Sequence, residues 1–133
     1  MEKYLFRGKR TDNGEFVEGY YSAELYSNSH YISAWYYGSY AELQKFEVIP
    51  DTVGQYIGKE DVNGKKVFEG DIVKYDGGLF VIKYYPPQMM YYLHGLHGRG
   101  GKNGFIMTNF NFAIVGNIYD NPELLSNERE GEK

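Results

Sequence analysis

Histidines are the side chains of this sequence that are best suited to binding a transition metal. His94 and His97 lie three residues apart in the segment LHGLHG, and His30 lies elsewhere in the chain. Neutral imidazole is a common ligand of zinc and nickel, but a catalytic zinc site needs a third protein ligand, and the local sequence supplies none. Gly95 and Gly98 also disfavour a helix that would hold two imidazoles at a fixed spacing. We therefore expect solvent-exposed loop histidines, with no metal and no other cofactor.

A second group with chemical potential is the carboxylate pair of Glu69 and Asp71, which flanks Gly70. Residues i and i+2 of a strand share one face, so the two carboxylates could act together on a substrate. No nucleophile, base or third ligand lies near them in the sequence. In the structural interpretation, Gly70 marks a bulge or a close backbone approach, and Asp71 accepts hydrogen bonds from backbone N–H groups. We adopt this interpretation and expect no enzymatic activity.

The glycine run Gly98–Gly104 could bind an anion through its backbone N–H groups, with positive charge added by Arg99 and Lys102. It does not match the phosphate-binding loop, because Lys102 precedes an asparagine and an expected strand instead of Ser or Thr and a helix. Tyr91 and Tyr92 precede the run and could stack on bases. Weak binding of single-stranded nucleic acid is therefore one expectation. The alternative is a glycine-rich loop that becomes ordered only when something packs on it.

Aromatic residues are dense in the first third of the chain. Eight of them lie within 21 positions: Tyr20, Tyr21, Tyr26, Tyr31, Trp35, Tyr36, Tyr37 and Tyr40. Tyr and Trp are common in interfaces because each joins a large apolar area to a polar tip, and a small core cannot bury all of them. One interpretation is core packing, and the other is a surface that binds a protein partner or a second copy of the chain. We name Trp35, Tyr36 and Tyr37, together with Tyr91 and Tyr92, as the candidate interaction surface.

Composition excludes several classes of function. The 133-residue chain contains no cysteine, which excludes a disulfide, a thiolate nucleophile and a cysteine-based zinc site. Its net charge of −4 provides no general attraction for nucleic acid or for anionic membranes. The N-terminal residues lack the apolar run of a signal peptide, and no segment is apolar over the length of a membrane span. We expect a soluble protein of the cytoplasm that has no membrane partner.

The elements that would position these residues are short strands separated by turns. Aromatics make up 18% of the residues and favour sheets, and 17 glycines suit a chain that turns often. Asn63-Gly64 is a strong turn dipeptide, because both residues accept positive φ. Residues 38–44 remain unassigned. The strands expected in the first half cover residues 3–8, 15–22, 31–37 and 45–49.

The second half predicts a hairpin followed by a long loop. Apolar side chains of residues 72–84 cannot all share one face, so we expect a bulge or a two-sided strand there. Pro86-Pro87 lack the N–H groups of a ladder and should stop the strand. Residues 86–104 are therefore expected to form a long loop or lid, and two short strands are expected from Gly104 onwards.

The end of the sequence predicts a short helix and the limits of the domain. Asn121 is expected to cap this helix, with Pro122 at its first position. The charged residues 127–133 are expected to form a frayed tail. Residues 1–126 should then form a single, mostly β domain: a curled antiparallel sheet, SH3-like or pseudo-barrel in form, with a short C-terminal helix.

Three segments carry a family resemblance. They are KYLFRGKR near the N-terminus, QYIGKEDVNGKKVFEGDIVKY in the middle and IVGNIYDNPELL near the end. In order and spacing they resemble the opening strand, the central signature and the closing motif of the YopX family of phage and prophage proteins. The middle segment departs from that signature at Ile57 and Lys59. The opening segment has Gly8 and Lys9 where the family has an aromatic residue after the arginine.

The resemblance implies a phage or prophage origin in bacteria and a β-dominated fold, and it carries over no activity, cofactor or catalytic residue. We therefore expect a non-catalytic accessory protein of the host cytoplasm. It would bind a host protein or associate with itself through the aromatic surface and the loop of residues 86–104. The alternative is a weak single-stranded nucleic-acid-binding module that uses Arg99, Lys102 and the nearby aromatics.

Overall fold

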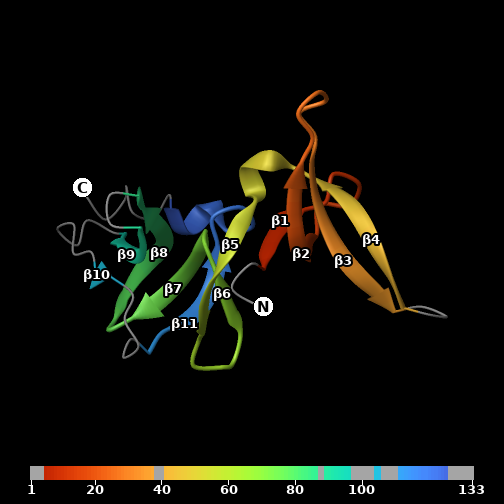
Figure 1. Ribbon diagram of the computed structural model, residues 1–133. Helices are drawn as coiled ribbons and strands as arrows, with labels where there is room; N and C mark the ends of the chain where they lie inside the picture. The colour runs from red at the N-terminus through yellow and green to blue at the C-terminus, as the bar shows by residue number, and fades with distance from the viewer. Residues whose placement is uncertain (1–4, 38–40, 87–88, 97–103, 106–110, 126–133) are drawn as a thin grey trace. The chain divides into compact units, whose positions relative to one another are not determined.

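The computed structural model is almost entirely β (Figure 1). Its strands form two antiparallel sheets, with the neighbour orders β4-β3-β2-β1-β5-β6 and β10-β9-β8-β7-β11. The prediction of a mostly β, antiparallel fold with a short C-terminal helix is confirmed, although the strands form two sheets and not a closed barrel. The residues that the structure describes are 5–37, 41–86, 89–96, 104–105 and 111–125.

The chain divides into two compact units, and the first is Met1–Tyr56. Its elements are β1 (Phe6–Lys9), β2 (Phe16–Ala23), β3 (His30–Tyr37), β4 (Ala41–Val48), the 3-10 turn η2 (Pro50–Thr52) and the beginning of β5 (Gly54–Glu60). The first three strands agree with those predicted. β4 begins earlier than the strand predicted over 45–49, because residues 41–44 pair one for one with β3. Cross-strand pairing therefore decides the structure of a segment whose local sequence is ambiguous.

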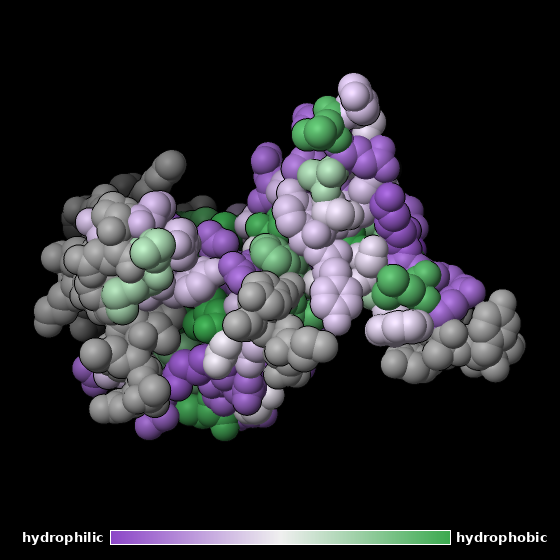
Figure 2. All heavy atoms as spheres, in the orientation of Figure 1, coloured by the Kyte–Doolittle hydropathy of each residue, from purple (hydrophilic) through white to green (hydrophobic). Residues whose placement is uncertain are grey.

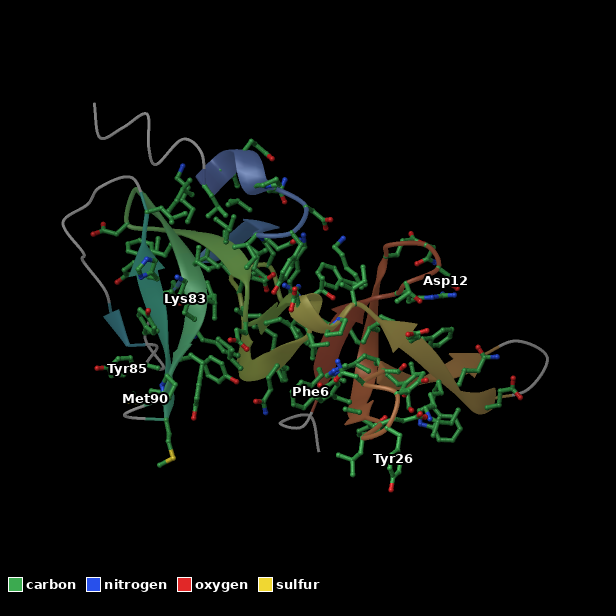
Figure 3. The ribbon with its side chains drawn as sticks, turned by 90° about the horizontal axis from the view of Figure 1, so that it is seen from above. Phe6, Asp12, Tyr26, Lys83, Tyr85 and Met90 are labelled. Atoms are coloured by element: carbon green, nitrogen blue, oxygen red, sulfur yellow. The ribbon has the colours of Figure 1, made fainter. Side chains whose placement is uncertain are left out.

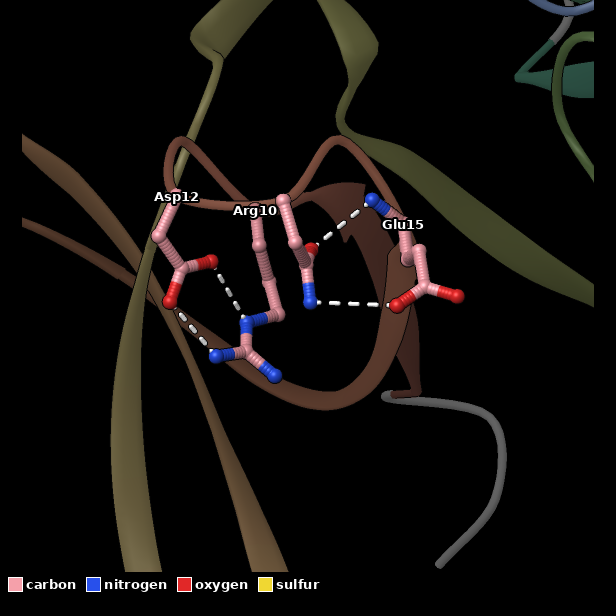
Figure 4. Close-up of polar contacts among 4 residues, drawn as sticks. Arg10, Asp12 and Glu15 are labelled. Carbon is pink, nitrogen blue, oxygen red and sulfur yellow. Dashed lines mark hydrogen bonds and ion pairs between the residues drawn. The ribbon is translucent and has the colours of Figure 1, made fainter.

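The turn between β1 and β2 is held by its own side chains (Figure 4). The Arg10 N–H donates to the Glu15 carbonyl at 2.9 Å, and Asn13 Oδ1 accepts from the Glu15 N–H at 2.9 Å. The Arg10 guanidinium donates to both carboxylate oxygens of Asp12, at 2.9 and 2.6 Å. This hydrogen bonding lowers the pKa of Asp12. The turn sequence thus forms the hairpin that it predicts.

Next to this turn, the first sheet curls back on itself. An isolated bridge joins Arg10, after β1, to Val48 at the end of β4. The four strands β1 to β4 curl around the buried side chains of Ile32 and Val48. Gly19 lies so close to β3 that a Cβ atom there would collide with the Ser33 carbonyl oxygen. The sheet is therefore curled, as predicted, but the single bridge does not extend into a ladder that would close a barrel.

The second unit is Ile57–Lys133. It contains the rest of β5, then β6 (Lys66–Phe68), β7 (Asp71–Tyr75), β8 (Gly78–Tyr85), β9 (Met90–Gly95), β10 (Gly104–Phe105) and β11 (Ala113–Asn117). A helix begins at residue 122, as predicted. Asp76 and Gly77 turn the chain between β7 and β8, with φ values of 49° and 80°.

Both faces of β7 and β8 are buried. Val73 and Ile82 pack in one apolar cluster, and Ile72 and Val81 pack in another. Helix residues 124–125 cover the second cluster. The ladder between the two strands has no shift of register. The prediction of a two-sided strand is therefore confirmed.

The prediction of a loop over residues 86–104 is wrong for its first part. β9 pairs with β8 from Tyr85↔Met90 to Phe80↔Gly95, so the chain turns back at Pro86 and resumes the sheet. Pro86 follows the last residue of β8, as expected from its missing N–H group, but it lies in a hairpin connection instead of at the end of the sheet. Residues 97–103, which hold most of the glycine run, lie outside the described residues.

Candidate functional site

The most exposed feature of the first unit is a two-stranded extension of β3 and β4. β2 pairs with β3 only as far as Tyr20↔Ser33, whereas the β3–β4 ladder continues to Tyr37↔Ala41. Residues 34–37 and 41–44 therefore extend beyond β2 as a ribbon of two strands, which we call the hairpin arm. Figure 1 shows this ribbon running on past β2. Two-stranded hairpins are at best marginally stable in water, so packing against another surface would stabilise such an arm.

The outer face of the arm carries a large apolar pair. Trp35 on β3 lies directly opposite Leu43 on β4. The side chains are 56% and 52% exposed, respectively. Ile32 occupies the opposite face of β3, because strand residues alternate, and it is completely buried. One strand thus sends Ile32 into the core and Trp35 into solvent.

The same face continues toward β2 with mixed chemistry. Ser33 of β3 lies opposite Tyr20 of β2 on one side and opposite Lys45 of β4 on the other. Tyr20 is also exposed. The Lys45 ammonium lies 4.2 Å from the centre of the Tyr31 ring and 3.4 Å from a Glu24 carboxylate oxygen. These contacts fix the lysine beside the apolar pair. The face therefore combines aromatic rings with one positioned cation.

A second protrusion on this unit is the turn between β2 and β3. The Glu24 N–H donates to the Ser29 carbonyl at 2.9 Å, and the Asn28 N–H donates to the Glu24 carbonyl at 3.1 Å. This frame presents Leu25 and Tyr26 with almost their whole side chains in solvent. Figure 3 shows Tyr26 pointing away from the strands, and Figure 2 shows hydrophobic atoms at the same turn and near the end of the arm.

The predicted interaction surface is divided by the structure. Trp35 belongs to the arm, whereas the side chains of Tyr36 and Tyr37 lie outside the described residues. Tyr91 and Tyr92 are neighbours on β9 of the second unit, so they point to opposite faces of that sheet. The apolar partner of Trp35, Leu43, was missed because it lies in the segment left unassigned. The signal that could have found it is the alternation of side chains along a strand. In β4 this alternation places Leu43, Lys45 and Glu47 on one face, opposite residues of β3.

Tyrosine pairs cover both faces of the β8–β9 hairpin. Tyr84 and Tyr91 pair on one face with ring centres 5.1 Å apart, and Tyr85 and Tyr92 pair on the other at 5.9 Å. Burial raises the pKa of Tyr91 to about 12, with smaller contributions from Glu69 and Tyr84. The Tyr91 hydroxyl is therefore neutral at physiological pH.

The face of Tyr85 and Tyr92 also holds polar groups. Lys83 lies opposite Tyr92 in the ladder, and the ring of His94 contacts Tyr92 edge-on with centres 5.9 Å apart. Figure 3 shows Lys83, Tyr85 and Met90 along this hairpin. Arg99 and Lys102, the predicted anion-binding residues, lie outside the described residues.

The histidines do not form a metal site in the part of the chain that the structure describes. His94 is a half-buried strand residue and not the exposed loop residue that the sequence predicted. His30 lies on β3 and hydrogen-bonds the Tyr21 hydroxyl. His97 lies outside the described residues. Within the described ranges, no three side chains of His, Asp or Glu gather into a group that could hold a metal ion.

The motif Glu69-Gly70-Asp71 joins β6 to β7 through a turn, and not through the bulge that was one of the two forms predicted for Gly70. Asp71 is 2% exposed, and its carboxylate accepts a hydrogen bond from the Phe68 N–H at 2.8 Å. Gly70 has a φ of +96°, and a Cβ atom there would lie 3.2 Å from the Tyr119 ring. Glu69 belongs to the turn before β7. The two carboxylates therefore do not face a common substrate site.

The turn at Asn63-Gly64 is organised by Asp61, which the sequence reasoning missed. The Asp61 carboxylate accepts hydrogen bonds from the N–H groups of Asn63 and Lys65, both at 2.9 Å, and of Ile114 at 3.0 Å. Burial opposes ionisation of this group, but the three donors outweigh it and lower the pKa of Asp61. An aspartate two residues before an Asn-Gly turn is the available signal.

At the C-terminal end, Asn121 joins β11 to the helix. Its side-chain oxygen accepts from the Asn117 N–H at 3.1 Å, and its backbone carbonyl accepts from the Leu124 N–H at 3.1 Å. Pro122 occupies the first helical position, as predicted. The side chain of Asn121 thus binds back to the strand instead of capping the helix.

Comparison with known proteins assigns the chain to a family. Among the described residues, no helix has the length and apolar character needed to cross a membrane. No curated protein matches the sequence. A family model described as YopX protein matches residues 5–126, which is most of the chain. The match includes the middle and closing segments that carried the resemblance and all but the first two residues of the opening one. The chain therefore belongs to the YopX family.

Proposed function

We propose that the chain is a non-catalytic protein-interaction module, encoded by a phage or prophage and acting in the cytoplasm of the bacterial host. The observation that carries the proposal is the exposed pair of Trp35 and Leu43 on the hairpin arm. Family membership supports the phage origin, and the lack of cysteine suits a reducing compartment.

Energetics favour a partner on the arm. Complete burial of a large apolar side chain is worth about 1.5–3 kcal/mol, and Trp is prominent among the residues that dominate binding energy. Trp35 and Leu43 gain little of this while they remain half in solvent. The cation of Lys45, held over the Tyr31 ring, adds a polar rim to the apolar pair.

A binding role also agrees with the chemistry of the acidic groups. Asp71 is committed to the Phe68 N–H, and Asp61 is committed to three backbone N–H groups. Both carboxylates therefore serve the fold. A general base needs reach to a substrate proton, and neither carboxylate has that reach.

Affinity capture from a host lysate tests the proposal. Wild-type protein is compared with a double variant, Trp35→Ser with Leu43→Ser, and with Val115→Ser as the control, because Val115 is an exposed apolar strand residue of the other unit. We expect at least one protein, another copy of the chain included, to be retained by the wild type and the control and lost by the double variant. Equal capture by all three folded proteins would rule the arm out as the contact surface.

A second candidate function is weak binding of single-stranded nucleic acid. It is favoured by the row of Tyr85, Tyr92 and His94 beside Lys83 on one face of the β8–β9 hairpin. Bases stack on such rings, and a nearby cation attracts phosphate. Fluorescence anisotropy with a labelled oligonucleotide at low salt should then show binding that Tyr85→Ala weakens and Tyr84→Ala, on the opposite face, does not. No binding at low salt would exclude this candidate.

A further inference from the structure

β4 is an edge strand of its sheet, and one part of its outer edge already forms backbone hydrogen bonds. The Thr11 N–H donates to the Glu47 carbonyl at 3.0 Å, and the Ile49 N–H donates to the Lys9 carbonyl at 2.8 Å. These two bonds flank the bridge at Val48. The remaining edge, residues 41–45, has no pairing strand among those that the structure describes.

The bonds to β1 also reveal which groups point outward along this edge. In an antiparallel strand, the N–H and C=O groups of alternate residues point to the same side. Glu47 and Ile49 point toward β1, and the ladder between β3 and β4 has no shift of register. Lys45, Leu43 and Ala41 must then present their N–H and C=O groups to the open edge. Such an edge is a template for another strand.

Side-chain chemistry selects one register for a symmetric partner. Two identical antiparallel strands pair symmetrically around one residue, which lies opposite its own copy. A centre at Glu42 or at Lys45 places like charges opposite each other, and a centre at Gln44 places Leu43 opposite a lysine. A centre at Leu43 places leucine opposite leucine, Glu42 opposite Gln44, and Ala41 opposite Lys45. Only the last of these registers avoids every unfavourable pair.

The same register extends the exposed apolar pair into a row. Trp35 lies beside Leu43 within one copy. Pairing at Leu43 would add the second copy's leucine and tryptophan on the same face, giving four large side chains across four strands. These four side chains would shield one another from solvent. Burial of apolar surface is the usual source of binding energy in such contacts.

We propose that two copies of the chain join through their β4 strands, antiparallel and centred on Leu43, into one continuous sheet. This inference rests on the proposed function and names the partner as a second copy. A contact made from one strand edge and four apolar side chains is small, so the dimer should form in a concentration-dependent manner.

The absence of cysteine in the natural chain allows a direct test of the register. Leu43→Cys would place two thiols with Cα atoms about 5.5 Å apart across the two-fold axis. Lys45→Cys, on the same face, would place them about 14 Å apart. Leu25→Cys is the control for random collision, because Leu25 is fully exposed in a turn. A short thiol-to-thiol cross-linker is applied to each variant, and light scattering follows the wild type over a range of concentrations.

We expect a wild-type dimer at high concentration and efficient cross-linking of Leu43→Cys alone. A monomer at every concentration, or cross-linking of Leu43→Cys no faster than that of Leu25→Cys, would overturn the inference, as would preferential cross-linking of Lys45→Cys. In that event, capture of a different protein that still depends on Trp35 and Leu43 would leave the proposed function intact. If the chain neither dimerises through Leu43 nor captures a protein that depends on Trp35 and Leu43, the arm is rejected as a binding surface.

Discussion

Trp35 and Leu43 lie directly opposite each other on β3 and β4, beyond the last residue of β3 that pairs with β2. The pair is therefore supported by two strands only, within the part of the chain that the structure describes. A large apolar pair in this position contributes little to the core of its own unit and remains available to another surface.

Replacing Trp35 should affect association and spare the fold. We expect Trp35→Ala to change the free energy of unfolding by less than about 1 kcal/mol, since most of its side chain is already in solvent. Ile32→Ala is the matched control, because Ile32 is a buried residue of the same strand, and it should cost about 2–5 kcal/mol. Urea denaturation measures both values. A loss at Trp35 as large as that at Ile32 would make the indole part of the core.

Gly70 should be intolerant of a side chain for two reasons. Its φ of +96° strains any other residue, and a Cβ atom would press on the Tyr119 ring at 3.2 Å. Gly77, with a φ of +80° and open space around it, isolates the first reason. We expect Gly70→Ala to destabilise the chain by about 1–3 kcal/mol and by more than Gly77→Ala. Equal losses in thermal denaturation would show that the tyrosine moves aside freely.

Acid should weaken the second unit through Asp61. Its pKa is lowered in the folded state, so its contribution to stability is fully present above the ordinary pKa of about 3.9 and is lost as the pH falls through the folded value. Asp61→Ala should remove this pH dependence and destabilise the fold by about 2–4 kcal/mol, because several N–H donors lose their acceptor. Unfolding curves of wild type and variant from pH 2 to 7 provide the comparison. Parallel curves over that range would contradict the assignment.

Tyr91 should be the tyrosine whose titration is most displaced among the described residues. Its pKa is raised to about 12, so the stability that it contributes is complete below the ordinary pKa of 10.0 and is lost as the pH rises through 12. Glu69→Gln should bring this pKa down, because the carboxylate opposes formation of a nearby phenolate. NMR titration of the labelled tyrosine ring carbons measures both values. A Tyr91 signal that titrates with those of the exposed tyrosines would refute the desolvation that raises this pKa.

Turn chemistry and alternation were readable from the sequence wherever they act locally. The turn after Arg10, the Asn63-Gly64 turn, the corner at Gly70 and the helix start at Pro122 are all where the residues predict them. Each depends on a few adjacent residues whose backbone preferences or hydrogen bonds are strong. The two-sided burial of the 72–84 hairpin followed equally from its apolar pattern.

Long-range pairing was not readable in the same way. Residues 41–44 look helical in isolation, and their strand exists because β3 lies beside them. Residues 90–95 follow two prolines, and only the ladder with β8 makes them a strand. For the same reason, Trp35 could be predicted as a surface residue from the sequence, but its partner Leu43 could not. Tyr91 and Tyr92 were assigned to one surface, although neighbours in a strand point to opposite faces.

The most direct measurement uses the single tryptophan of the chain, Trp35, as its own reporter. Its fluorescence is recorded as protein concentration rises, with and without acrylamide as a quencher, for the wild type and for Leu43→Lys. The account predicts emission that moves to shorter wavelength and becomes protected from quenching in the wild type only. Emission that remains that of a solvent-exposed indole at every concentration, identical in the two proteins, would contradict it.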